Sequence, residues 1–258
     1  MNRISITVDR AIASSWIPLL CTLFVFLVPV STVIWGIPAA GNLVASHMPV
    51  VWEHKLGRYV LNVVDMQTEP TKLNSAKQVI YENRIRKLAN LAGLPSLEIY
   101  FRHAPPNAIA IPGNIIVITD GLIDLMDDVE VVDAVIAHEL GHLQLRHGLR
   151  RIVSMNLFST LVLRMNGQDG TAATTDNVLA SLTLFPFFSR ENESQADSYA
   201  FVLLNKNGQS PLLFAKAMIK LSELKNNNKP NEVGYSDSHP PTQQRIKAAE
   251  AAAMDIKN

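Results

Sequence analysis

The sequence predicts an α+β fold: a mainly α-helical domain with a small β-sheet, preceded by one N-terminal transmembrane helix. Three observations support this prediction. No residue between Arg10 and Glu53 is charged, and this run is strongly apolar. Beyond residue 71, most apolar residues recur at helical spacing. Only two stretches there, residues 97–103 and 107–119, are rich in β-forming residues, so the sheet should be small.

The composition limits the class of protein. The 258 residues carry 23 acidic and 23 basic side chains, and this balance gives no indication of a nucleic-acid partner. Cys21 is the single cysteine, which excludes a disulfide framework and a cysteine metal site. We expect four parts: a short tail over residues 1–13, a transmembrane anchor over 14–36, a linker and lead-in over 37–70, and the folded domain over 71–258.

The expected anchor, residues 14–36, is long enough to cross a bilayer as a helix at about 1.5 Å per residue. Trp16 and Trp35 stand near its ends, where an aromatic belt would lie. A cleaved signal peptide would have a much shorter apolar core, and a buried soluble helix is rarely apolar all round. Because Arg3 and Arg10 closely flank the N-terminal end, we expect a single-pass protein whose body lies on the periplasmic, non-cytoplasmic side.

After the anchor, residues 37–51 contain prolines and a glycine and are expected to form a linker. Residues 71–92 have helical periodicity, and residues 97–103 alternate as a strand does. Residues 107–119 form a second extended run. Pro112-Gly113 in its middle predicts a turn or bulge, and a proline there fits an edge strand.

Asp120 is expected to cap a short helix, and Asp127 or Asp128 to begin a long helix that extends to His147. Two later apolar runs, residues 152–163 and 178–188, are short for a full membrane crossing. We expect two helices packed on the body; the alternative is a hairpin that dips into the bilayer or lines a substrate entrance. Further helices are expected over residues 191–204, 211–224 and 242–254.

The long helix contains a possible metal site, the pattern His138-Glu139-Leu140-Gly141-His142. Two histidines four residues apart lie on one face of a helix, so both imidazoles can reach one metal ion. Glu139 can lean over the same ion and act as a base toward water. The pattern therefore favours a zinc hydrolase.

A catalytic zinc usually has three protein ligands, so a third should lie on a separate element. Glu193 and Asp197 are four residues apart and share a helical face, whereas Glu191 points nearly the opposite way. Glu193 can then bind the metal while Asp197 accepts a hydrogen bond from a ligating histidine. Ala196 is small, which would let two helices approach closely.

Four separated blocks resemble the M48 zinc metallopeptidases: NAIAIPGNIIVITDGL, HELGHLQLRH, SRENESQAD and SHPPTQQRI. The resemblance covers residues 73–252 and leaves out the anchor. It implies a zincin-like metallopeptidase domain that binds one Zn²⁺ per chain. By this resemblance His138, His142 and Glu193 would be the zinc ligands, and Glu139 the general base.

The resemblance also implies supporting roles. Asp197 would orient a ligand, and His239 or Arg245 would touch the reacting carbonyl. A structural turn before the final helix is the alternative for His239. His147 matches the family's block, but helical spacing turns it away from the metal, which indicates a structural residue. An extended substrate peptide would pair with an edge strand that includes Asn107, Ala108, Ile109 and Ala110.

The function implied is that of a membrane-anchored, zinc-dependent endopeptidase. Its polypeptide substrates would be misfolded or membrane-associated proteins in envelope quality control. Its partners would be the lipid bilayer, contacted through residues 14–36, and membrane or envelope proteins. One alternative is a membrane-anchored chaperone or adaptor that retains the zinc-binding fold with latent or no proteolytic activity. In another, a loop over residues 226–239 covers the metal until a misfolded partner displaces it.

Overall fold

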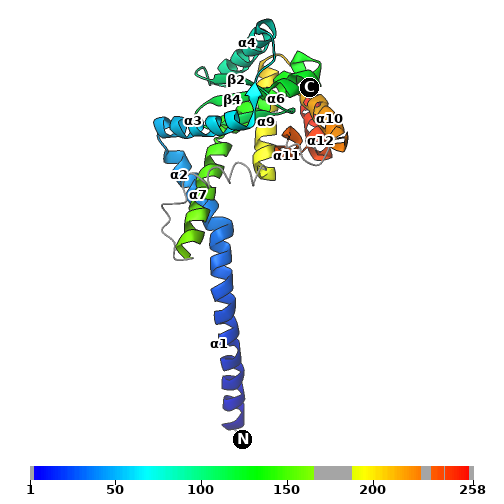
Figure 1. The fold of residues 1–258 in the computed structure, drawn as a ribbon. Helices are drawn as coiled ribbons and strands as arrows, with labels where there is room; N and C mark the ends of the chain where they lie inside the picture. Colours follow the sequence, from blue (N-terminus) through cyan, green and yellow to red (C-terminus); the bar gives the residue numbers. More distant parts are fainter. Residues whose placement is uncertain (1–2, 166–187, 228–233, 241, 256–258) are drawn as a thin grey trace.

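A long N-terminal helix projects from a body of shorter helices that surround one small sheet (Figure 1). The computed structural model describes residues 3–165, 188–227, 234–240 and 242–255. The N-terminus lies at the far end of the long helix, away from the body (Figure 1). The predicted α+β class, mainly helical with a small sheet, is confirmed.

The chain up to residue 67 is almost entirely helical. It forms helices α1 (Arg3–Ser31), α2 (Ile37–His47) and α3 (Val50–Gln67), with a π-helical turn, η1 (Thr32–Gly36), between the first two. Within the described residues, no helix combines the length and apolar character that a membrane crossing requires. The transmembrane helix expected over residues 14–36 is not confirmed.

The linker expected over residues 37–51 is wrong for most of its length, because helix α2 forms there. Pro38 lies in the first turn of α2, directly after the π-helical turn η1, and its fixed φ suits a helix. Gly41 marks a close helix crossing: a Cβ there would lie 1.9 Å from Ser154 Oγ of helix α7 (His147–Met165). Helix α2 packs along α7 at this crossing (Figure 1).

The sheet has the strand order β1-β2-β4-β3, formed by β1 (Glu69–Pro70), β2 (Glu98–His103), β3 (Ala108–Ile111) and β4 (Ile115–Thr119). Strands β2 and β4 are parallel, and the two outer pairs are antiparallel. The extended run over residues 107–119 is thus a hairpin. Its turn lies at Pro112-Gly113, as predicted, and Gly113 has φ +84°. Among the described strands β3 pairs with β4 alone, so the predicted edge strand is confirmed for residues 108–111. The rest of the run, β4, lies between β2 and β3 and is not an edge strand.

Strand β4 is buried along its whole length because helices cover both faces of the sheet. Ile116 and Ile118 point into the main core, which includes residues of α4, α5 and α6. Ile115 and Val117 point to the opposite face, where they pack with residues of α3 and with Ile152 of α7. The edge strand β3 is therefore held between α6 and the pair α3 and α7.

The remaining described helices are α4 (Ser75–Leu91), α5 (Asp120–Met126), α6 (Val129–Gln144), α9 (Arg190–Lys206), α10 (Leu212–Asn227), α11 (Tyr235–Ser238) and α12 (Gln243–Asp255). The Asp128 side chain caps α6 by accepting from Glu130 N, as predicted. The cap of α5 is Thr119 and not Asp120. Asp120 instead accepts a hydrogen bond from the Thr71 hydroxyl, which ties the lead into α4 to the sheet.

The first later apolar run, residues 152–163, lies inside α7. Its contact with a bilayer stays a prediction. Of the second run, residues 178–187 lie outside the described residues, as do residues 228–233 of the expected covering loop.

Helix α6 lies at the centre of the body, and every residue from Val131 to Leu143 is buried. Helix α9 crosses it at Gly141, where a Cβ would lie 3.1 Å from both the Cα and the carbonyl oxygen of Ala196. The predicted close approach at Ala196 is therefore confirmed. The crossing brings the first turns of α9 beside the last turns of α6.

Candidate metal centre and cleft

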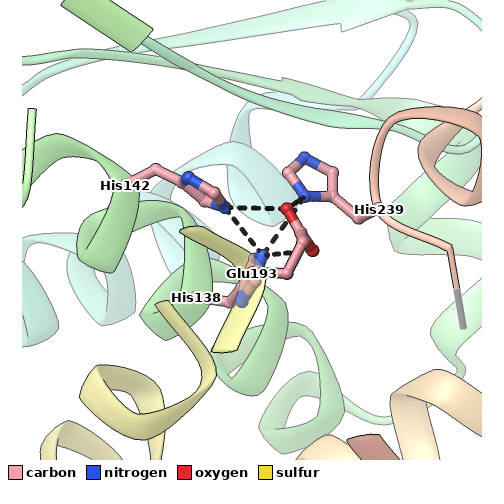
Figure 2. A group of neighbouring side chains, drawn as sticks. All are labelled: His138, His142, Glu193 and His239. Atoms are coloured by element: carbon pink, nitrogen blue, oxygen red, sulfur yellow. Dashed lines mark hydrogen bonds and ion pairs between the residues drawn. The ribbon is translucent and has the colours of Figure 1, made fainter. Parts of the chain in front are cut away.

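Two histidines on α6 face each other across one helical turn. His138 and His142 are both buried, and their Nε2 atoms lie 3.0 Å apart. The ring planes are nearly perpendicular, at 76° (Figure 2). Two N–H groups cannot face each other at this distance, so at least one Nε2 presents a lone pair.

Helix α9 brings a carboxylate to these nitrogens. Glu193 Oε1 lies 3.4 Å from His142 Nε2, and Glu193 Oε2 lies 3.6 Å from His138 Nε2 (Figure 2). Glu191, two residues earlier, is exposed, as helical spacing predicts. Burial alone would raise the pKa of Glu193, but the charge of His239 and its hydrogen bond with Glu193 hold that pKa far below its ordinary value.

The donor set suits a divalent metal ion. Two imidazole nitrogens and one carboxylate form a set of protein ligands that zinc prefers at catalytic sites. Ligand atoms of His138, His142, Glu193 and His239 all lie within 4.8 Å of one another, so this group could hold one ion. All four side chains are buried, which limits competition from water for the ion.

A chain of hydrogen bonds determines which nitrogen of His142 faces this cluster. Gln195 Nε2 donates to Glu191 Oε1 at 2.8 Å, which leaves Gln195 Oε1 to accept from His147 Nε2 at 3.1 Å. His147 Nδ1 must then accept from His142 Nδ1, 3.1 Å away. His142 is thereby held as the Nδ1–H tautomer, with the Nε2 lone pair directed toward Glu193. Burial also holds the pKa of His142 well below its ordinary value, which keeps the ring neutral.

Asp197 and Arg245 lie behind His138. Asp197 Oδ1 is 2.9 Å from His138 Nδ1, the nitrogen on the far side of the ring from the cluster. Arg245 donates to both oxygens of Asp197, and its Nη1 lies 2.9 Å from Glu193 Oε2. Burial would raise the pKa of Asp197, but hydrogen bonds with Arg245 and His138 outweigh it and lower that pKa. The predicted role of Asp197, to orient a histidine ligand, agrees with this contact and stays a prediction.

His239, just after α11, joins the cluster from a third direction (Figure 2). Its Nδ1 lies 2.9 Å from Glu193 Oε1, and its Nε2 lies 3.6 Å from Glu139 Oε1. Burial would lower the pKa of His239, but these two carboxylates outweigh burial and raise it. Tyr235 stacks on the ring with centroids 4.5 Å apart and fixes its plane. His239 therefore belongs to the cluster, and it also lies in the bend that precedes the final helix.

Glu139 connects α6 to the edge strand. Ala110 N of β3 donates to Glu139 Oε2 at 3.1 Å. The other oxygen, Oε1, is buried and has no hydrogen-bond partner in the described part of the chain. Glu139, His239 and the outer edge of β3 line one cleft of about 300 Å³. Within the described residues, Glu139 therefore presents an oxygen that makes no hydrogen bond, beside the cleft and 3.6 Å from His239 Nε2.

Only alternate residues of β3 offer backbone groups to the cleft. Thr119 N donates to Asn107 O, so Asn107 pairs with β4. Antiparallel alternation then turns the backbone of Ile109 to β4 and the backbone groups of Ala108 and Ala110 outward. The predicted four-residue substrate strand is therefore corrected. Ala108 has an outward N–H and C=O, and Ala110 has an outward C=O and an N–H that donates to Glu139, whereas the backbones of Asn107 and Ile109 face β4.

Another correction concerns Arg245, which was expected at the reacting carbonyl. Its guanidinium is buried against Asp197 and Glu193 instead, on the side of the ligands away from the cleft. The other predicted site residues converge on the cluster or its cleft: His138, Glu139, His142, Glu193, Asp197 and His239.

Sequence reasoning missed two neighbours of His142. His147 was expected to be structural and off the metal-facing line, yet it contacts the outer nitrogen of His142. Helical spacing could not find it, because Arg146 has φ +54° and separates α6 from α7. Phe188 stacks on the His142 ring with centroids 4.1 Å apart, and no pattern in the sequence distinguishes this aromatic residue from its neighbours.

Helix α6 carries two candidate metal ligands, helix α9 crosses it with a carboxylate, and the edge strand β3 lies beside them. This is the arrangement of a metallopeptidase. The model of peptidase family M48 matches residues 75–253, and the chain belongs to this family. The match begins at the first residue of α4 and ends within α12.

The chain is similar to several metalloproteases. It is 29% identical to metalloprotease LoiP of Escherichia coli K12 over 174 residues, 64% of this chain and 68% of that protein. It is 27% identical to metalloprotease YcaL of the same strain over 180 residues, 66% of this chain and 69% of that protein. It is 23% identical to mitochondrial metalloendopeptidase OMA1 of Schizosaccharomyces pombe over 175 residues, 66% of this chain and 52% of that protein.

Proposed function

We propose that this chain is a zinc-dependent endopeptidase in which His138, His142 and Glu193 hold the ion. The observation that carries the proposal is the hydrogen bond from Ala110 N to Glu139 Oε2. It joins the free strand edge, where an extended peptide can pair, to the carboxylate beside the candidate ligands. A protein that only held peptides would not need, at this junction, a buried carboxylate oxygen that makes no hydrogen bond within the described residues.

The substrate would add a strand to the sheet at β3. The outward N–H and C=O of Ala108 and the outward C=O of Ala110 can bond to any extended polypeptide, because these bonds do not depend on the substrate's side chains. The Ala110 N–H stays with Glu139. A peptide that pairs there runs through the cleft past Glu139 and His239, which brings an internal peptide bond to the site. This supports an endopeptidase.

A bound zinc ion would polarise the scissile carbonyl and the attacking water. Glu139 Oε1 accepts the proton of that water and later delivers it to the leaving amine. The Ala110 N–H holds the other oxygen, so Oε1 stays available. His239, whose pKa the two carboxylates raise, donates a hydrogen bond to the charge that develops on the carbonyl oxygen. Arg245 keeps Asp197 and Glu193 in place from behind.

Residues 14–36 would anchor the chain in a membrane, with the peptidase domain on the periplasmic side. The support lies in the sequence: the uncharged run between Arg10 and Glu53, and the basic residues at its N-terminal end. The substrates would then be misfolded or membrane-associated envelope proteins. A relative named beta-barrel assembly-enhancing protease of Escherichia coli K12 agrees with this; it is 22% identical over 236 residues, 86% of this chain and 48% of that protein.

Carbonate extraction of membranes and proteinase K digestion of spheroplasts test the anchor. The chain should stay with the membrane pellet, and its domain should be digested in intact spheroplasts. Release by carbonate would contradict the anchor, and protection from the protease would reverse the orientation.

Casein hydrolysis by the purified full chain tests the activity. Phenanthroline should stop hydrolysis, and zinc added in excess should restore it. A rate of hydrolysis that phenanthroline does not change would contradict a metal-dependent mechanism. A zinc-loaded, folded protein that binds casein without cleaving it would favour the membrane-anchored chaperone or adaptor.

A further inference from the structure

Arg151 of α7 lies in the wall of the cleft and has no anionic partner among the described residues. Its side chain lines the cleft beside Glu139 and the outer edge of β3. Its Nη2 is buried and has no hydrogen-bond partner among the described residues. Burial lowers the pKa of Arg151, and no carboxylate of the described chain offsets this effect.

Other arginines of the body differ in this respect. Arginines that are largely withdrawn from solvent have carboxylate partners, namely Arg84 with Asp133, Arg146 with Glu53 and Arg245 with Asp197. A charge removed from water without a partner is unfavourable, so such a group is usually neutralised or paired. Arg151 is thus suited to a partner that arrives from outside the chain.

The position of Arg151 relates it to the peptide path. Gly148, Arg151 and Ile152 lie on one face of α7, at helical spacing, and all three line the cleft. A Cβ at Gly148 would lie 3.6 Å from Ala110 O, the carbonyl at the free edge of β3. This face of α7 therefore borders the line along which a substrate strand would pair.

Phe188 links Arg151 to the metal cluster. The Arg151 Cζ lies 5.5 Å from the centroid of the Phe188 ring, and this ring stacks on His142 with centroids 4.1 Å apart. One aromatic ring thus separates the guanidinium from a candidate metal ligand. The contact with Phe188 engages the cation through the ring face and does not satisfy the buried Nη2 donor.

We propose that Arg151 is a specificity residue that binds a carboxylate of the substrate peptide. An extended substrate rises ~3.3 Å per residue, so this carboxylate would belong to a residue within about three positions of the scissile bond. This inference rests on the proposed peptidase function. The guanidinium fork suits a carboxylate because it can donate two parallel hydrogen bonds. The carboxylate can come from an aspartate or glutamate side chain or from the C-terminus of the substrate. The chemistry is the same for both sources.

Matched peptides test the proposal with the purified full chain. Fluorogenic peptides carry Glu or Gln at each of the three positions on either side of the cleaved bond, each made as the free acid and as the C-terminal amide. The wild type should prefer Glu to Gln at one position by about 100-fold in kcat/KM, mainly through KM. If instead the free-acid peptides are preferred to their C-terminal amides, whether they carry Glu or Gln, Arg151 binds the C-terminal carboxylate of the substrate.

Substitutions then separate recognition from folding. Arg151→Gln should abolish the preference between the Glu and Gln peptides, whereas Arg151→Lys should retain part of it. Arg151→Glu should favour a Lys peptide over the Glu peptide. Arg150→Gln, which removes the same charge from the adjacent position outside the cleft lining, should behave as the wild type.

Binding can be measured without hydrolysis. Fluorescence anisotropy of the labelled Glu and Gln peptides with Glu139→Gln should give the same preference as kinetics. If no peptide is cleaved but Glu139→Gln still distinguishes the pair through Arg151, the peptidase proposal fails and the carboxylate site stands. Two results would overturn the inference. One is a wild type that cleaves the Glu, Gln, acid and amide peptides with equal kcat/KM. The other is a preference for the Glu peptide that persists in Arg151→Gln.

Discussion

Arg245 holds Asp197 with two parallel hydrogen bonds, from Nε to Oδ2 at 2.8 Å and from Nη2 to Oδ1 at 2.7 Å. Asp197 in turn lies against the outer nitrogen of His138, and Arg245 Nη1 reaches Glu193. One buried guanidinium therefore supports two of the groups around the candidate metal site. Its pKa is raised because hydrogen bonds and the charges of these carboxylates outweigh its burial.

Arg245→Met should destabilise the fold by about 3–5 kcal/mol, because it leaves two buried carboxylates without their counter-charge. Urea unfolding of the metal-free protein measures this. Arg86→Met is the matched control: Arg86 pairs with Glu82 on the exposed side of α4, and its loss should cost under about 1 kcal/mol. Equal effects of the two substitutions would contradict the support assigned to Arg245.

The pKa of Asp197 predicts a pH dependence. Because the folded state lowers this pKa below the ordinary value of 3.8, Asp197 contributes stability above that pH, and the contribution is lost as pH falls through the folded pKa. Asp197→Asn should therefore be less stable than the wild type at neutral pH, with the difference shrinking below pH 3.8. Urea unfolding with a chelator, from neutral pH to about pH 3, checks this. If the difference in stability between the wild type and Asp197→Asn instead grew as pH fell, the folded state would raise the pKa of Asp197 and not lower it.

Glu193→Ala should lose the metal ion, and Glu191→Ala should retain it. Glu193 is buried beside two imidazole nitrogens, whereas Glu191 is exposed and reaches the cluster only through Gln195 and His147. Elemental analysis of both purified variants measures the metal directly. Retention of a full equivalent by Glu193→Ala would remove Glu193 from the ligand set.

His147→Phe should weaken metal binding by about 10- to 100-fold, the effect typical of removing a group that orients a histidine ligand. The substitution keeps an aromatic ring at the start of α7 but removes the nitrogen that accepts from His142 Nδ1. Competition with a chromophoric zinc chelator gives the affinity. An unchanged affinity would show that the hydrogen bond does not select the His142 tautomer.

Helical periodicity in the sequence was sufficient to predict much of the candidate site. His138 and His142, and likewise Glu193 and Asp197, share helical faces because each pair is four residues apart, and the structure brings the two faces together. The edge strand followed from Pro112-Gly113, which marks the hairpin turn beside β3.

Features set by tertiary packing could not be found in this way. The side to which Arg245 points depends on how α12 packs against α9, and local spacing contains no such information. The outward direction of Ala108 and Ala110 depends on the register with β4, which neither alanine encodes. Helix α2 was missed because Gly41 resembles a break in sequence, whereas the structure uses it for contact with Ser154.

Glu139 is the base of the proposed mechanism and is not one of the proposed metal ligands, and Glu139→Gln tests this assignment directly. Metal content and peptide cleavage are measured on the same preparations of the variant and the wild type. We expect the same metal content, one equivalent per chain, and a rate lower by about 10²–10⁴-fold, because an amide cannot accept the proton of the attacking water. Cleavage at the wild-type rate, or loss of the metal with the carboxylate, would contradict the mechanism.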